Sequence, residues 1–338
     1  MIVHVALSLA LALLPVLVFL LLLVLLDSYK LLPWDRVARM LVFGAFAAIA
    51  SIGANRLVIH VWHPDHITFA RYIAPVVEEL LKGSIVIALL LTRRFGFLVD
   101  AAICGFAVGA GFAAFENIYY LRALGDTSLV LWMIRGFGTA IMHGSVTANI
   151  AVAAKQLSDR HGGATILTIA PGWLAAMGLH SVFNQFPLSP NMSTAILLLL
   201  LPAFFGAVFR ISESKTRDWL GAGFDSDQEL LAAVNSGRIA ESRIGQYLEE
   251  LKTRFDGTTV VDMLCLLRLR LELSIRAKGI MIMRKAGFAP APDPTFNERF
   301  AEMKFLEKSI GPTGLIAIKP IVHISDRDLW QYHMLGAK

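Results

Sequence analysis

Seven apolar stretches, each near the roughly 20 residues that a helix needs to cross a bilayer, fill the first two thirds of the chain. Hydrocarbon offers the backbone no hydrogen-bond partner, so stretches of this kind fold as helices. Hydrophobic residues make up 56% of the 338 residues and charged residues 17%, which is too apolar for a soluble domain. We therefore expect an all-α, polytopic membrane helix bundle. Its spans are predicted at residues 2–26, 37–62, 72–92, 95–121, 129–153, 164–186 and 193–211.

The distribution of Lys and Arg predicts how these helices cross the membrane, because both residues concentrate in cytoplasmic loops. They follow the first, third, fifth and seventh stretches, for example at Lys30, Arg93, Lys155 and Arg210. The alternate loops contain few of them. We therefore expect an external N-terminus and a cytoplasmic C-terminus. The net charge of +5, from 31 basic and 26 acidic residues, is explained by this loop bias and indicates no nucleic-acid partner.

Beyond about Ile211 the composition changes, because charged residues become frequent and amphipathic patterns replace the solid apolar runs. We expect residues 1–211 to form the transmembrane core and residues 212–338 to form a small helical cytoplasmic domain. This second part contains no P-loop, no paired-cysteine zinc motif and no dinucleotide fingerprint. The sequence predicts no role for it.

Titratable side chains interrupt four of the apolar stretches. The third stretch contains the adjacent carboxylates Glu78 and Glu79, with Lys82 one turn further along. Three later stretches each contain one more titratable group: Glu116, His143 and His180. An ionised group near the centre of a bilayer costs at least about 2.5 kcal/mol, so such residues indicate a functional site by default.

With the predicted orientation, these groups lie at similar depths on the outer side of the membrane. Glu78, Glu79 and Lys82 fall on the order of 9–15 Å inside the outer surface, at about 1.5 Å per helical residue. Glu116 and His180 fall at a similar level, and His143 lies somewhat deeper. We therefore expect four helices to bring these side chains together in the outer leaflet.

Helical spacing adds three supporting residues. Lys82 follows the glutamate pair by three and four residues, so it can neutralise one carboxylate within its own helix. Phe112 shares a helix face with Glu116, and Asn184 shares one with His180.

Two hydrolytic chemistries use such a set of side chains. In a glutamic hydrolase, one glutamate acts as general base on a water while His and Asn donors hold the oxyanion. In a metal hydrolase, Glu and His bind zinc, which lowers the pKa of a bound water. Adjacent buried glutamates repel each other unless one is protonated, paired with Lys82 or bound to a cation. The residues by themselves leave both chemistries open.

At these positions the chain resembles the PrsW family of intramembrane proteases over roughly residues 35–210. Four motifs in the family's order carry the resemblance: Glu78-Glu79-Leu80-Leu81-Lys82, Phe112-Ala-Ala-Phe-Glu116, His143-Gly-Ser-Val-Thr147 and Gly178-Leu-His180-Ser-Val-Phe-Asn184. The resemblance implies cleavage of a membrane-anchored protein. In the best-known members this substrate is an anti-sigma factor cut on its extracytoplasmic side, which agrees with a site in the outer leaflet.

The resemblance also implies roles for these residues. The related CAAX-type prenyl endopeptidases and Abi proteins use a glutamate base, but they have histidine where the second motif here has glutamate. By analogy, Glu79 or Glu78 is expected to be the base. We favour Glu79 as the residue that activates the water, with Glu78 sharing its proton or holding Lys82. His180 and Asn184 are then expected to stabilise the oxyanion.

The PrsW family is also classed with metalloproteases, so zinc is the candidate cofactor. Glu116 and His143 are then expected to orient the water or bind the metal. The candidate zinc ligands that the resemblance implies are Glu79, Glu116, His143 and His180. The expected location is the bacterial inner membrane, and the sequence predicts no oligomeric state.

The same side chains have a structural interpretation. An ion pair between the glutamate pair and Lys82, or between Glu116 and Arg56 or Arg135, would only fix helix packing. Two carboxylates for one lysine are an unusual choice for that purpose, and this favours a functional site.

Two other function classes compete with a protease. A proton-coupled or ion transporter would use a Glu/His/Lys relay, but it should carry polar residues through both leaflets. Here the inner halves of the spans hold little besides Asp100, and no inverted repeat is visible. A membrane scaffold acting through its C-terminal region would leave the buried glutamate pair unexplained. The sequence therefore favours an intramembrane peptidase.

Overall fold

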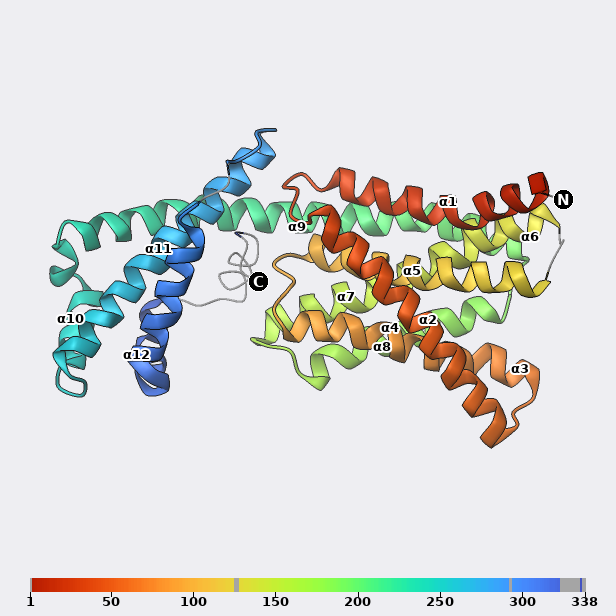
Figure 1. The fold of residues 1–338 in the computed structure, drawn as a ribbon, viewed down its shortest axis with the longest axis horizontal. Helices are drawn as coiled ribbons and strands as arrows, with labels where there is room; N and C mark the ends of the chain where they lie inside the picture. Colours follow the sequence, from red (N-terminus) through yellow and green to blue (C-terminus); the bar gives the residue numbers. More distant parts are fainter. Residues whose placement is uncertain (1, 125–127, 292–293, 323–334, 336–338) are drawn as a thin grey trace. The chain divides into compact units, whose positions relative to one another are not determined.

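The computed structural model describes residues 2–124, 128–291, 294–322 and 335, and helices are the only regular secondary structure among them (Figure 1). This confirms the expected all-α fold. The first part of the chain forms α1 (Ile2–Leu26), α2 (Trp34–Trp62), α3 (His66–Thr68), the π-helix η1 (Phe69–Ile73), α4 (Ala74–Leu91), α5 (Leu98–Leu124), α6 (Leu129–Met133), the π-helix η2 (Ile134–Ala140), α7 (Ile141–His161) and α8 (Ile166–Asn184). The rest forms α9 (Pro190–Asn235), the 3-10 helix η3 (Arg238–Glu241), α10 (Arg243–Leu251), α11 (Gly257–Lys285) and α12 (Phe296–Val322).

Six helical segments of the described chain are long and apolar enough to cross a membrane: Val3–Leu26, Trp34–Trp62, Leu98–Ala123, Leu129–His161, Ile166–Asn184 and Pro190–Asn235. The expected third span, residues 72–92, corresponds to the end of η1 together with α4 and is not among them. The reason is that the 18 residues of α4 include Glu78, Glu79 and Lys82. All three are buried inside the protein, so their polar groups meet other side chains instead of lipid.

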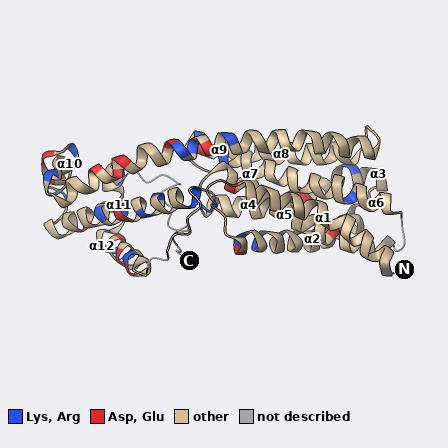
Figure 2. Cartoon of the chain, turned by 90° about the horizontal axis from the view of Figure 1, so that it is seen from above, with Lys and Arg blue, Asp and Glu red and all other residues tan. Residues whose placement is uncertain are grey.

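The chain divides into two compact units, Met1–Ser212 and Glu213–Lys338. In the second unit, α10, α11 and α12 bury a shared apolar core that includes Leu248, Met263 and Leu306. The Tyr247 hydroxyl donates to the carbonyl of Ala317 at 2.7 Å and ties α10 to α12. Figure 2 shows charged residues recurring along α10, α11 and α12, whereas α4, α5, α7 and α8 are mostly uncharged.

In the first unit, α5 is almost entirely buried and packs against α2, α7 and α1. Glycines let α5 approach α7 closely. A Cβ atom added to Gly109 would collide with the backbone of His143 and Gly144, and one added to Gly105 would meet Thr147 and Ala148. This backbone-to-backbone packing, typical of small residues in membrane helices, brings the C-terminal half of α5 beside the start of α7.

Candidate active site

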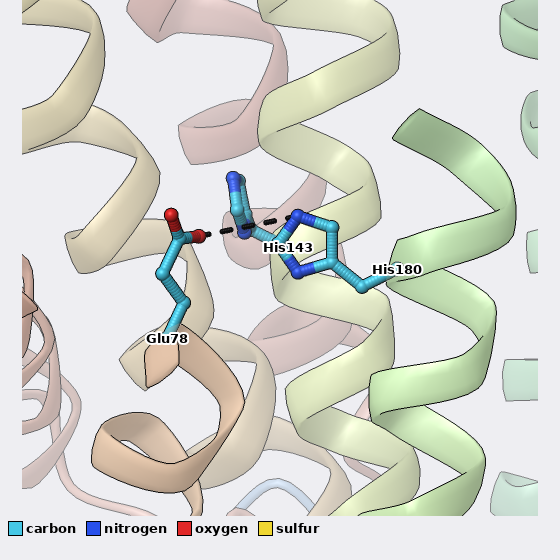
Figure 3. A group of neighbouring side chains, drawn as sticks. All are labelled: Glu78, His143 and His180. Carbon is cyan, nitrogen blue, oxygen red and sulfur yellow. Dashed lines mark ion pairs between the residues drawn. The ribbon is translucent and has the colours of Figure 1, made fainter. Parts of the chain in front are cut away.

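Three helices bring Glu78, His143 and His180 together. Glu78 lies on α4, His143 on α7 and His180 on α8, and one ligand atom from each lies within 4.8 Å of the other two. Figure 3 shows the Glu78 carboxylate facing the His180 ring, with His143 beside the line between them. The Oε2 atom of Glu78 is 3.9 Å from Nε2 of His180. The two imidazole rings are perpendicular, with their centroids 4.8 Å apart.

Glu79 points at the same site but is held by two partners on one oxygen. The Lys82 ammonium donates to Oε1 at 2.5 Å, and Nδ1 of His180 lies 2.8 Å from the same atom. The other oxygen, Oε2, is buried and has no hydrogen-bond partner among the described residues. Because a carboxylate only accepts, Nδ1 of His180 must carry its proton, and Nε2 is left with a lone pair directed toward Glu78.

Lys82 is completely buried and connects the glutamate pair to His143. Its Nζ lies 2.9 Å from Nδ1 of His143 and 4.6 Å from the centroid of the Phe112 ring. A lysine ammonium has only donors, so Nδ1 of His143 accepts and Nε2 of this ring carries the proton. Phe112 also contacts His143 directly, with 5.1 Å between ring centroids. Lys82 and Phe112, two of the three residues added by helical spacing, thus both lie against His143.

Glu116 approaches His143 from α5. Its Oε2 lies 3.2 Å from Nε2 of His143 and 3.3 Å from a guanidinium nitrogen of Arg135. Arg135 stands in the π-helix η2, and Arg56 is exposed on α2. The structure therefore selects Arg135 as the ion-pair partner of Glu116.

Asn184 makes its contact at the edge of this site. Its Nδ2 donates to the carbonyl of Ala70 at 3.0 Å, so this donor links the end of α8 to the π-helix η1. This bond uses one of the two N–H donors of the Asn184 amide, and the other remains for the oxyanion role expected from the sequence. The other seven residues named from the sequence lie together: Glu78, Glu79, Lys82, Phe112, Glu116, His143 and His180.

Two further side chains hold the site and were not expected from the sequence. Trp173 donates from its indole nitrogen to the backbone carbonyl of Glu79 at 2.6 Å. Asn117, directly after Glu116 in the chain, accepts from Nε of Arg135 at 2.8 Å. A polar residue in an apolar span was the available signal for Asn117. Trp173 gave no signal, because tryptophan is ordinary in such a span.

A comparison with models of known protein families identifies the family of this chain. The model of the PrsW family, described as an intramembrane metalloprotease family, matches residues 32–209, more than half of the chain. The chain belongs to the PrsW family. This confirms the resemblance seen in the four motifs, all of which lie inside the matched segment. Comparisons with curated proteins and with solved structures found no match.

As a member of the PrsW family, the chain is an intramembrane peptidase. Its candidate spans make it a multi-pass membrane protein, and its substrate is a membrane protein. The first helix and all residues after 209 lie outside the segment that the family model covers.

The donor set of the PrsW site fits a zinc ion. Two imidazoles and one carboxylate are ligands that zinc uses in catalytic sites, where a fourth position stays open. Ligand atoms of a tetrahedral zinc are about 3.3 Å apart, by geometry from bond lengths near 2.0–2.1 Å. The 3.9 Å separation of Glu78 and His180 is close to this. The Glu79–His180 hydrogen bond is the contact that typically fixes a zinc-binding imidazole. The converging group thus contains Glu78, where the resemblance had named Glu79 and Glu116.

Proposed function

We propose that this protein is a zinc-dependent intramembrane peptidase whose metal is held by Glu78, His143 and His180. The observation that carries the proposal is the convergence of their donor atoms within 4.8 Å, with His180 oriented by Glu79. A zinc ion in such a site supplies an acidified water and polarises the carbonyl of the peptide bond.

The remaining side chains then have distinct tasks. Glu79 holds the Nδ1 proton of His180 and so keeps Nε2 free for the metal. Lys82 balances the charge of Glu79, and both side chains are completely buried. His143 contacts Lys82 through Nδ1 and Glu116 through Nε2, so holding the metal would require one of these two contacts to give way. Glu116, about one fifth exposed and 3.2 Å from Nε2 of His143, would take the proton of the attacking water.

A metal-free glutamic mechanism is the second candidate, and one observation favours it. Oε2 of Glu79 is buried without a partner among the described residues, so it is available to accept a proton. In this mechanism Glu79 is the water-activating base, and His180 stabilises the oxyanion. Lys82 holds the other oxygen of Glu79 in both mechanisms.

Metal content distinguishes the two candidates. We would purify the full chain and its variants in detergent and determine zinc by elemental analysis. The zinc mechanism predicts about one zinc per chain in the wild type and little in Glu78→Gln or His143→Ala. His161→Ala serves as the control, because His161 is an exposed histidine at the end of the same helix as His143. A wild type that cleaves its substrate without any metal would overturn the zinc proposal and favour the glutamic mechanism.

We further propose that the substrate is a membrane-anchored protein of the anti-sigma-factor kind, cut near the outer leaflet of a bacterial inner membrane. The resemblance of the four motifs supports the substrate class, and the Lys/Arg bias of the loops supports the side of cleavage. Mapping the cut site by mass spectrometry, in a reconstituted reaction with a candidate substrate, tests this. A cut on the cytoplasmic side would contradict it.

A further inference from the structure

The first helix reaches the candidate site although it precedes the family-matched segment. The carbonyl of Ala12 on α1 accepts a hydrogen bond of 2.9 Å from Nδ2 of Asn117 on α5. Asn117 is 1% exposed, so this contact is shielded from solvent and lipid. In an apolar surrounding such a bond is costly to break, because the freed amide group finds no other partner.

Asn117 also contacts Arg135, and Arg135 in turn contacts Glu116. Its Oδ1 accepts from Nε of Arg135 at 2.8 Å, and the guanidinium lies 4.2 Å above the Tyr120 ring. A second nitrogen of Arg135 is 3.3 Å from Oε2 of Glu116. The same carboxylate oxygen is 3.2 Å from Nε2 of His143. A continuous series of polar contacts therefore joins the backbone of α1 to a proposed metal ligand.

The chemistry of asparagine fixes the direction of this series. The arginine side chain has only donors, so the amide oxygen of Asn117 must face Arg135. The amide nitrogen then faces the Ala12 carbonyl, which only accepts. Leucine can replace neither contact, and aspartate can replace only the one to Arg135. Asparagine is thus matched to both of its partners.

Close packing holds α1 in this position. Its buried residues Ser8, Ala12, Val16 and Leu20 recur every four positions and form one stripe. A Cβ atom added to Gly136 of η2 would collide with the backbone of Leu11, so only glycine lets the two segments meet here. Figure 1 shows the first half of α1 running beside α6, which leads directly into η2.

We infer that Asn117 and Arg135 are positioning residues that hold Glu116 beside His143, and that α1 is thereby part of the metal site. This inference rests on the proposed zinc function. Without Asn117 the guanidinium loses its fixed orientation, and Glu116 loses the partner that sets its place relative to the imidazole. Glu116 is the direct partner of the proposed ligand His143, and loss of such a partner typically changes metal affinity 10–100-fold.

The test measures metal binding directly. We would load the detergent-purified full chain with Zn²⁺ to obtain the dissociation constant, and with Co²⁺ to record its visible absorption spectrum. Asn117→Leu removes both amide contacts, and Gly136→Ala separates α1 from η2 while leaving every polar side chain in place. The matched controls are Gly53→Ala and Arg56→Gln on α2: a Cβ at Gly53 meets nothing within 4 Å, and Arg56 is exposed.

We expect both site variants to bind zinc about 10–100-fold more weakly and to show an altered Co²⁺ spectrum, with the controls unchanged. Unchanged affinity and spectrum in either folded variant would overturn the inference while leaving the zinc proposal intact. A wild type that binds no zinc would instead overturn the proposed function, and this inference with it. If Asn117→Leu does not fold, Gly136→Ala decides alone.

Discussion

The indole N–H of Trp173 on α8 donates to the backbone carbonyl of Glu79 on α4 at 2.6 Å. Gly83, one turn further along α4, leaves the space in which this ring lies, because an added Cβ would be 2.5 Å from the indole nitrogen. The hydrogen bond between Trp173 and Glu79 thus fixes the position of α4 along α8. It thereby also fixes the distance between Glu79 and His180.

Gly83→Ala should therefore impair cleavage strongly. The added methyl group displaces the Trp173 ring and shifts Glu79 relative to His180, and a shift near 1 Å can cost on the order of 10²-fold in rate. The measurement is the cleavage rate at saturating substrate. Gly178→Ala on α8 is the control, since a Cβ there meets nothing within 4 Å. Equal loss in both variants would mean that Trp173 has no special role.

Glu79→Gln should abolish cleavage and also lower stability. The substitution leaves the completely buried Lys82 ammonium without its counter-charge, and breaking a buried ion pair costs about 3–5 kcal/mol. The double variant Glu79→Gln/Lys82→Met removes both charges, so its melting temperature should recover while cleavage stays absent. Thermal unfolding in detergent and a cleavage assay measure the two effects. Recovered cleavage in the double variant would show that Glu79 serves only to neutralise Lys82.

The orientation of the bundle can be read by cysteine labelling. In a background with Cys104 and Cys265 replaced, Ser189→Cys should react with a membrane-impermeant maleimide from outside intact cells. His161→Cys, at the C-terminal end of α7 and close in sequence to the start of α8, should react only after the membrane is permeabilised. Both positions are exposed, so reactivity reports sidedness. The reversed pattern would place the proposed site in the inner leaflet.

Removing the chain after Lys215 should leave catalysis intact. The site residues all lie in the compact unit Met1–Ser212, and the second unit has its own core between α10, α11 and α12. The truncated protein is compared with the full chain for zinc content, melting temperature and cleavage rate. Loss of cleavage in a truncated chain that still binds zinc would give the second unit a role in handling the substrate.

The start of α11 should be sensitive to acid. Asp256 caps this helix by accepting from the amide of Thr259 at 2.6 Å, and its hydrogen bonds to Thr259 and Thr258 lower the pKa of this carboxyl below its ordinary 3.8. The cap thus stabilises the fold above about pH 3.8, and this contribution is lost as the pH falls through the lower folded-state pKa. In Asp256→Ala the amide of Thr259 should exchange its hydrogen faster at neutral pH. Asp225→Ala, at an exposed position on α9, should leave that amide unchanged.

The expected spans and the clustering of the charged groups follow from the sequence because they rest on composition and helical depth. Four helices that place titratable groups at similar depth can bring them together, and the structure does so with Glu78, Glu116, His143 and His180. The π-helices η1 and η2 could not be anticipated, since their extra residue reflects tertiary packing and no local propensity.

The hydrogen-bond partners of individual polar side chains also could not be predicted from the sequence. Asn117 bonds the backbone of α1, more than 100 residues away along the chain, and Asn184 bonds the backbone of η1. Each of these bonds depends on which turn of one helix lies against another. Helical spacing within one element, such as Glu79 to Lys82, was by contrast readable in advance.

The candidate site contains more acidic than basic side chains. Three carboxylates, those of Glu78, Glu79 and Glu116, stand against two basic side chains, Lys82 and Arg135. One negative charge is left over in a region where lipid makes isolated charge expensive. A proton or a metal ion must supply the balance, so uptake of the metal should release protons into the medium. Calorimetry in buffers of different ionisation enthalpy would count them.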